Sequence, residues 1–154
     1  MFTRFAIALI LGALLGTERE LVGKEAGVRT EMLVAAGAAI FTIVGISLPY
    51  LISSETGNLT NVIAGNSGFL TLIGNIVVGV GFLGAGLIIH TGDRAHGLTT
   101  AALVWTTAAI GILVGLGLYA FAVTTSIVII VLLYIFRKLN ISEKFEEHTE
   151  PLRR

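Results

Sequence analysis

Long apolar stretches separated by short polar ones dominate the chain. No acidic or basic residue occurs between Glu31 and Glu55 or between Arg94 and Arg137. A helix that crosses the hydrocarbon core needs about 20 mostly apolar residues, so the second stretch is long enough for two crossings. The natural turn between these crossings is Gly115-Leu116-Gly117. The pattern predicts an all-α bundle of about five transmembrane helices, at residues 2–17, 31–52, 68–91, 98–114 and 118–137.

The first predicted helix is the shortest of the five. Only thirteen uncharged residues separate Arg4 from Glu18, and a cleavable signal peptide has an apolar core of similar length. However, no small-x-small cleavage pattern follows this core. Gly12 and Gly16 instead have the GxxxG spacing that allows membrane helices to pack closely. We therefore expect a retained helix, with the Arg4 side chain extending toward the interface.

Composition supports a membrane protein and excludes several other classes. Hydrophobic residues make up 55% of the chain and charged residues 13%, against roughly 25% charged residues in soluble domains. Ten basic and ten acidic residues leave no basic excess for binding nucleic acid. The chain has no cysteine, which excludes disulfides and thiolate chemistry. No nucleophile, base and orienting acid occur together, so we expect no enzyme, no catalytic residues and no cofactor.

The basic residues are distributed unevenly between the two sides that five spans define. One side carries only Arg4, whereas the other carries nine Lys and Arg residues. Cytoplasmic loops of membrane proteins have an excess of such residues. This asymmetry predicts an outer N-terminus, a cytoplasmic C-terminus, a transmembrane domain over residues 1–137 and a short polar cytoplasmic tail over residues 138–154.

The polar connection after the first predicted helix contains seven of the twenty charges. Glu20 and Lys24 have a favourable i,i+4 spacing, and Glu31 lies where the next helix begins, which favours a negative charge. One interpretation is therefore a solvated, self-paired connection. The other is that Glu18 and Glu20 enter the bilayer and either pair with Arg29 or bind a hard cation such as Mg²⁺. Two acids among three bases make a poor cation cage, so ion pairing is favoured.

A glycine-rich run, Gly79-Val80-Gly81-Phe82-Leu83-Gly84, matches the dinucleotide motif GxGxxG. A dinucleotide site requires this motif to join a strand to a helix, with an acid about 20 residues later. Here the run lies in an apolar stretch, and no acid follows between Asp93 and Glu143. Helix packing, extended through Gly86, is favoured. A broken helix that lines a cavity is the third possibility.

A few polar side chains in or near the predicted spans need an explanation. Asn75 requires a partner in the bilayer, either in an interhelical hydrogen bond or along a polar path. None of the predicted spans carries a full charge in its interior, which argues against a proton relay or charge-coupled pump. His90, Asp93 and His96 have an H-x2-D-x2-H spacing, but they straddle a helix end and a glycine-containing turn. Polar tips at the interface are favoured over a metal site.

Several short blocks occur in a distinctive order along the chain. They are GTERE at 16–20, AGVRT at 26–30, GVGFLGAG at 79–86 and GLTTAA at 97–102, followed by Trp105. Together they resemble the MgtC/SapB family over about residues 12–119. The residues that we select as its functional motif are Glu18, Arg19, Glu20, Arg29, Thr30, Asn75, Gly79, Gly81, Gly84, Gly86, Thr99, Thr100 and Trp105.

This resemblance implies a bacterial inner-membrane protein linked to growth under magnesium limitation and, in pathogenic members, to virulence. Some members are thought to restrain the rotary ATP synthase, whereas magnesium transport is not a secure property of the family. We therefore expect a non-enzymatic regulator that contacts another membrane complex, such as ATP synthase. The alternative is a transporter or channel for magnesium or another small ion, formed by the bundle or by a homo-oligomer.

The chain departs from the family pattern at two places. Family members often carry an Asp-Pro-x-Arg block before the glycine run, where this chain has Gly68-Phe69-Leu70-Thr71, and Asn75 replaces the usual Gln. Longer members also continue into a soluble cytoplasmic domain, whereas we expect this chain to end in its short tail. Roles that depend on that acid and base, or on that domain, are therefore not expected here.

Overall fold

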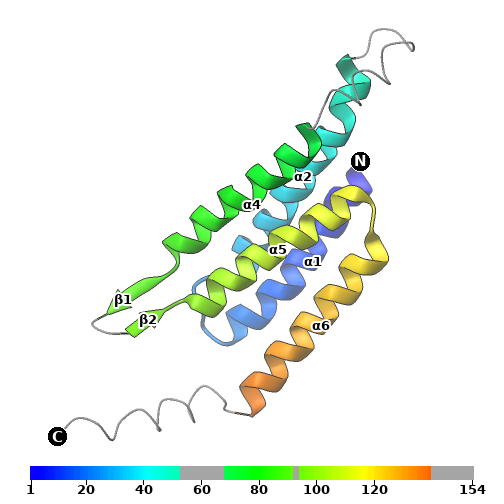
Figure 1. The fold of residues 1–154 in the computed structure, drawn as a ribbon. Coiled ribbons are helices and arrows are strands. Elements are labelled where there is room, and N and C mark those ends of the chain that lie inside the picture. The colour runs from blue at the N-terminus through cyan, green and yellow to red at the C-terminus, as the bar shows by residue number, and fades with distance from the viewer. Residues whose placement is uncertain (53–67, 92–93, 140–154) are drawn as a thin grey trace, which may run out of the picture.

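The chain folds into a bundle of roughly aligned helices (Figure 1). The computed structural model describes residues 1–52, 68–91 and 94–139. These residues form α1 (Phe2–Leu21), α2 (Val28–Ile52), α4 (Gly68–Gly86), β1 (Ile89–Thr91), β2 (Arg94–His96), α5 (Leu98–Leu116) and α6 (Tyr119–Lys138). By length and composition, α2, α4, α5 and α6 can each cross a membrane. The predicted all-α transmembrane bundle of about five helices is confirmed.

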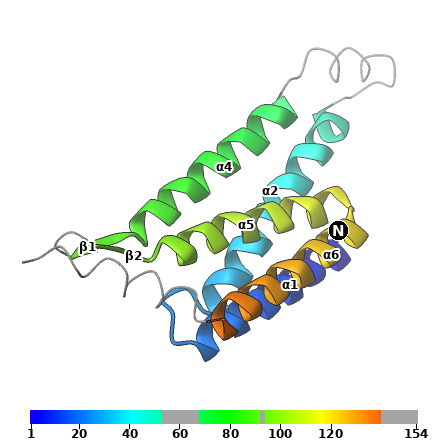
Figure 2. The same cartoon turned by 60° about the horizontal axis from the view of Figure 1, so that its bottom comes forward.

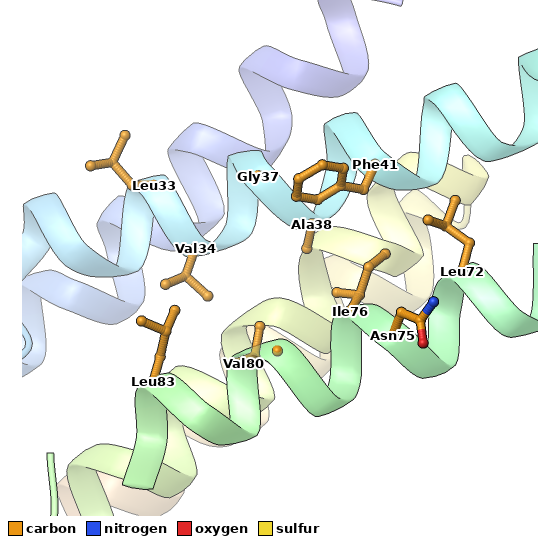
Figure 3. Close-up of a pocket in the computed structure, with 11 residues that line it drawn as sticks. Leu33, Val34, Gly37, Ala38, Phe41, Leu72, Asn75, Ile76, Val80 and Leu83 are labelled. Atoms are coloured by element: carbon orange, nitrogen blue, oxygen red, sulfur yellow. The ribbon is translucent and has the colours of Figure 1, made fainter. Parts of the chain in front are cut away.

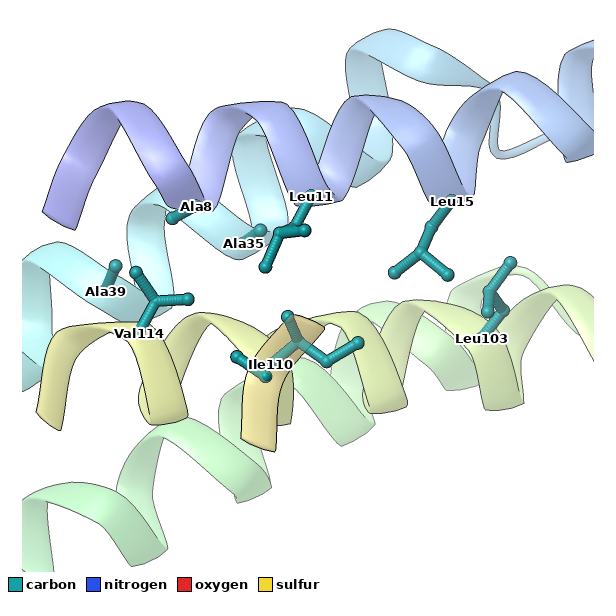
Figure 4. Close-up of a cluster of buried hydrophobic side chains, with 9 residues drawn as sticks. Ala8, Leu11, Leu15, Ala35, Ala39, Leu103, Ile110 and Val114 are labelled. Carbon is teal, nitrogen blue, oxygen red and sulfur yellow. The ribbon is translucent and has the colours of Figure 1, made fainter. Parts of the chain in front are cut away.

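The centre of the bundle is the contact between α1, α2 and α5. It contains small and branched apolar side chains: Ala8, Leu11, Leu15, Ala35, Ala39, Leu103, Ile110 and Val114, joined by Ala122 of α6 (Figure 4). Helices α4 and α6 lie on opposite sides of this centre (Figure 2). Most of their side chains are exposed although the helices are strongly apolar. In a bilayer, lipid solvates such surfaces.

Glycines in α1 bring its backbone directly onto the start of α2. A Cβ atom on Gly12 would lie 2.5 Å from the carbonyl oxygen of Glu31. A Cβ atom on Gly16 would lie 2.5 Å from the Cα of Val28. Real Cβ atoms do not approach other atoms so closely, so only glycine fits at these two positions. The packing role predicted for the GxxxG pair is confirmed.

A second glycine pair, in α5, brings that helix close to α2. A Cβ atom on Gly111 would overlap the carbonyl oxygen of Ala35, and one on Gly115 would lie 2.6 Å from the Cβ of Thr42. Helix α2 is therefore in close contact with both α1 and α5. Small residues at both contacts favour this arrangement in a membrane, where helices associate by close packing.

The glycine-rich run of α4 differs from these two pairs. It lies in a continuous α-helix, so the strand-to-helix turn of a dinucleotide site is absent and the broken-helix possibility is also wrong. Cβ atoms on Gly79, Gly81 and Gly86 would meet no atom within 4 Å. Only Gly84 faces α5, where its Cβ would lie 3.5 Å from the carbonyl oxygen of Ala101. The predicted packing role of the run is therefore wrong within this chain, except at Gly84.

Helix α4 ends earlier than predicted, and a β-hairpin follows it. In this hairpin His90 pairs with Ala95, whereas His96 pairs with Ile89. Directly paired residues point to the same face and neighbours along a strand point to opposite faces, so the two histidines lie on opposite faces. Asp93 falls outside the described residues. Within the described residues, the H-x2-D-x2-H spacing does not gather a metal site.

The start of α1 contacts the C-terminal end of α5. The Arg4 Nη1 atom donates a hydrogen bond to the carbonyl oxygen of Gly115 at 2.7 Å. Gly117 ends α5 in a left-handed conformation with φ 87°, so of the predicted turn Gly115-Leu116-Gly117 only Gly117 lies outside the helix. Arg4 thus neutralises carbonyl groups at the C-terminal end of α5, while the charges of the first connection lie near its N-terminal end.

Candidate functional site

Helix α1 continues beyond its predicted end and carries three charged residues with it. Glu18, Arg19 and Glu20 lie in the last turns of the helix rather than in a loop. The helix ends at Leu21, and Gly23 follows in a left-handed conformation with φ 68°. Because α1 packs against α2, α5 and α6, this extension brings charged side chains into the helix contacts.

Arg19 is buried, with 5% of its surface exposed. Its Nη2 atom donates a hydrogen bond of 2.7 Å to Oγ1 of Thr100, which is itself buried in α5. Its Nη1 atom lies 4.0 Å from Oε2 of Glu18. A guanidinium presents five donors in a fixed plane, so it can contact several elements at once. This hydrogen bond joins two residues of the selected functional motif, Arg19 and Thr100.

Glu31 is completely buried, with 0% of its surface exposed. The sequence suggested a solvated carboxylate at a helix start, and that expectation is wrong because α1 lies on the first turn of α2 through Gly12. Thr107 of α5 and Arg19 are the groups that interact with the carboxylate. Within the described part of the chain, neither Glu31 oxygen nor the Thr107 hydroxyl has a hydrogen-bond partner in good geometry. A buried carboxylate in this state is rare and points to a functional role.

The remaining charges of α1 have partners other than the expected Arg29. Glu18 Oε1 lies 3.8 Å from Nη1 of Arg137, which comes from the end of α6. Glu20 Oε2 accepts a hydrogen bond of 2.9 Å from the backbone N–H of Val28 and so caps the start of α2. Arg29 is exposed. The predicted pairing with Arg29 is therefore wrong, because α1 aims Glu18 at α6 and Glu20 at the α2 terminus.

These contacts define one site, the charged cluster, which consists of Glu18, Arg19, Glu31, Thr100, Thr107 and Arg137. Four helices contribute to it: α1, α2, α5 and α6. Sequence reasoning missed Glu31, Thr107 and Arg137 as members. The available signal was the GxxxG pair of α1, since a helix that packs closely on the start of α2 must cover the charge found there.

The other selected motif residues lie outside the charged cluster. Thr30, Thr99 and Trp105 are exposed, and Trp105 retains 48% of its surface. Lipid or a protein neighbour can contact them, but they make no part of the buried network. Their selection came from the family resemblance, and their roles stay predictions.

Asn75 and Gly79 lie at a second place, an apolar groove between α2 and α4 (Figure 3). The groove has a volume of about 460 Å³. It is lined by Leu33, Val34, Gly37, Ala38, Phe41, Leu72, Asn75, Ile76, Gly79, Val80 and Leu83. Asn75 contributes the only polar side chain of this lining, so the groove is suited to apolar groups rather than to ions or water.

The charged cluster does not continue into a polar path across the bundle. The centre of the bundle between the cluster and the Arg4 end is filled by the buried apolar side chains named above. The Thr42 hydroxyl, which is buried there, donates a hydrogen bond to the carbonyl oxygen of Ala38 at 2.8 Å and is satisfied locally. The weak metal candidates Glu18 and Glu20 have separate protein partners and do not converge on one position.

Comparison with known proteins gives a consistent family. The model of the MgtC family matches residues 5–141. An uncharacterised protein of Haemophilus influenzae is 36% identical over 132 residues, which are 85% of this chain and 53% of that protein. Protein MgtC of Brucella abortus is 37% identical over 132 residues, 86% of this chain and 49% of that protein. The "Putative magnesium transporter YhiD" of Escherichia coli K12 is 37% identical over 145 residues, 91% of this chain and 64% of that protein.

The chain spans about half to two thirds of the length of these relatives. No solved structure matches it. The matched region includes all five helices, the charged cluster and the apolar groove. The comparisons therefore concern the part of the molecule in which both candidate sites lie.

Proposed function

Because this chain belongs to the MgtC family, we propose that it is a non-enzymatic regulator of magnesium homeostasis that docks on another protein within the bacterial inner membrane. The names of its relatives support the link to magnesium. In this proposal the charged cluster lies at the cytoplasmic side, as the distribution of Lys and Arg predicts. The partner is an integral membrane complex, of which the ATP synthase is one candidate.

The observation that carries this proposal is the outward face of α4. At 100° per residue, Gly74, Gly81 and Ala85 lie within a narrow sector of this helix. All three residues are exposed, and Cβ atoms on the two glycines would meet no atom within 4 Å. We call these three residues the small-residue face.

The small-residue face contrasts with the other glycine pairs of the chain. The pairs in α1 and α5 hold helices at backbone contact, which shows how this fold uses small residues. In a bilayer, where apolar side chains gain nothing by leaving lipid, such close contact is a main source of helix association. The face on α4 offers the same geometry without any of the described helices against it, and this supports docking of a foreign helix.

The proposal predicts that bulk on the small-residue face abolishes partner binding. In native membranes, photo-crosslinking and mass spectrometry should identify a stoichiometric foreign partner of the wild-type chain. Gly74→Leu and Gly81→Leu should each lower this crosslink by about tenfold, since a leucine side chain prevents close helix approach. Growth under magnesium limitation should fall in parallel, because docking is the regulatory step.

Ala120→Leu is the matched control, since Ala120 is an exposed small residue on α6. It should leave both crosslinking and growth at the wild-type level. The proposal is wrong if the wild-type chain gives only crosslinks to itself, or if the leucine variants on α4 keep the foreign partner.

An ion pathway is the second candidate function, and the buried Glu31 carboxylate is the observation that favours it. Ionisable residues inside membrane segments frequently mark ion routes. Since apolar packing separates the charged cluster from the Arg4 end, we expect purified protein in liposomes to show no magnesium flux above empty vesicles. Flux that disappears in Glu31→Gln would establish this second function in place of the regulator.

A further inference from the structure

Among the described residues, the carboxamide of Asn75 has no hydrogen-bond partner. Asn75 lies near the middle of α4 and is exposed at the groove between α2 and α4 (Figure 3). No hydrogen bond to its side chain occurs among the described residues. The rest of the groove lining is glycine, alanine and larger apolar side chains. The described part of the chain therefore leaves this carboxamide open to a polar partner from another molecule.

The hydrocarbon around Asn75 makes a hydrogen-bond partner energetically important. Helix α4 is one of the helices apolar enough to cross a membrane, so its middle lies in hydrocarbon. An amide without a hydrogen bond in such a medium costs several kcal/mol, and water does not supply the bond at this depth. Acyl chains offer neither donor nor acceptor. The occupant of the groove must therefore be a protein segment that presents both groups at the same depth.

A second copy of this chain meets that requirement. A carboxamide has an N–H₂ donor and a carbonyl acceptor, so two carboxamides related by a two-fold axis can form two hydrogen bonds with each other. The same residue on both copies lies at the same depth in the bilayer. The chemistry of the site is thus self-complementary, which a foreign helix would match only by carrying its own amide at that depth.

The helix surface around Asn75 also has room for a second α4. Gly79 lies one turn further along the same side, and a Cβ atom there would meet no atom within 4 Å. The absence of a side chain at this position lets a second helix approach closely enough for short amide contacts. Phe82 lies beside them with 81% of its surface exposed, and it provides an apolar side chain for the partner's groove.

We propose that two copies of this chain pack through the Asn75 side of α4, with their Asn75 carboxamides hydrogen-bonded to each other and the Phe82 rings in the facing grooves. This interface is rotated by about 100° from the small-residue face, because Asn75 directly follows Gly74 in the helix. The dimer therefore leaves the small-residue face free, and it stands or falls independently of the docking partner.

Single cysteines test this interface directly, because the chain contains none of its own. Gly79→Cys should form a disulfide-linked dimer when native membranes are treated with a mild oxidant. Ile127→Cys is the matched control, since Ile127 is an exposed residue of α6 on the opposite side of the bundle. It should give only background crosslinking. Equal crosslinking at the two positions would overturn the proposal.

The role of the amide is tested in the Gly79→Cys background. Asn75→Leu should reduce the crosslinked dimer by about tenfold, the effect of losing two intramembrane hydrogen bonds. Asn75→Gln should restore much of it, because glutamine keeps both groups. Thermal unfolding in detergent should be unchanged in Asn75→Leu, since the Asn75 side chain has no hydrogen-bond partner among the described residues. Undiminished crosslinking in Asn75→Leu, or a groove that holds only lipid in native mass spectra, would refute the interface.

Discussion

Arg19→Met should destabilise the folded bundle by about 3–5 kcal/mol, the range for removing one member of a buried charged network. The change leaves the fully buried Glu31 carboxylate without the positive charge that interacts with it. It also removes the guanidinium that donates a hydrogen bond to Oγ1 of Thr100 and that places a positive charge near Glu18. The measurement is thermal or chemical unfolding of the purified chain in detergent, followed by circular dichroism.

Two further variants separate the charge from the packing. Arg29→Met is the matched control, because Arg29 is exposed, and its effect should be small. Glu31→Gln should recover part of the loss when combined with Arg19→Met, since an amide is cheaper to bury than an unpaired carboxylate. Equal losses for the two arginine variants, or no rescue in the double variant, would show that Arg19 does not stabilise the cluster electrostatically.

Gly111→Ala should destabilise the contact between α2 and α5 although it adds a single methyl group. That methyl would overlap the carbonyl oxygen of Ala35 and would lie 2.9 Å from the Cβ of Ala38. Neither obstacle is a flexible side-chain end, so the helices must separate. Overpacking of this kind costs about 1–3 kcal/mol, which outweighs the better helix propensity of alanine. Unfolding in detergent measures the change.

Gly37→Ala is the matched control for this prediction, since it makes the same substitution in α2. A Cβ atom on Gly37 would meet no atom within 4 Å. Its effect should be neutral or stabilising by up to about 1 kcal/mol, from helix propensity alone. If both substitutions changed stability equally, close approach at Gly111 would not explain the packing of α5.

The sequence predicted the helices well because charge and apolar length determine where a chain can cross a membrane. Only the ends moved. Helix α1 extends into its charged residues because Arg19 finds Thr100 and Glu18 finds Arg137. Helix α4 ends earlier and is followed by a β-hairpin. The pairing of its strands cannot be recognised in the pattern of apolar residues.

The sequence predicted helix packing correctly only where the spaced glycines of one helix face a neighbouring helix. A Cβ atom on Gly12 or Gly111 would meet α2, whereas one on Gly81 would meet no atom of the described residues within 4 Å. Glycine content shows that a helix can be approached closely, but not which helix approaches it. The choice depends on the three-dimensional order of the helices, and a single sequence does not contain that information in a local pattern.

The candidate site was predicted in part. Its acidic and basic residues were visible as a charged connection, and Arg19 and Thr100 were both among the selected motif residues. The burial of Glu31 was not, because a carboxylate four residues into a helix usually faces solvent. Its position under α1 depends on contacts between segments far apart in the chain, as does the ion pair of Glu18 with Arg137.

The hydrogen bond between Arg19 and Thr100 joins residues 81 positions apart, and this separation constrains how the protein is made. During synthesis α1 leaves the ribosome long before α5, so Arg19 has to wait without its final partner while about eighty residues follow. The charged cluster also includes Arg137 near the end of α6, so its last contact forms only after α6 has emerged and been inserted.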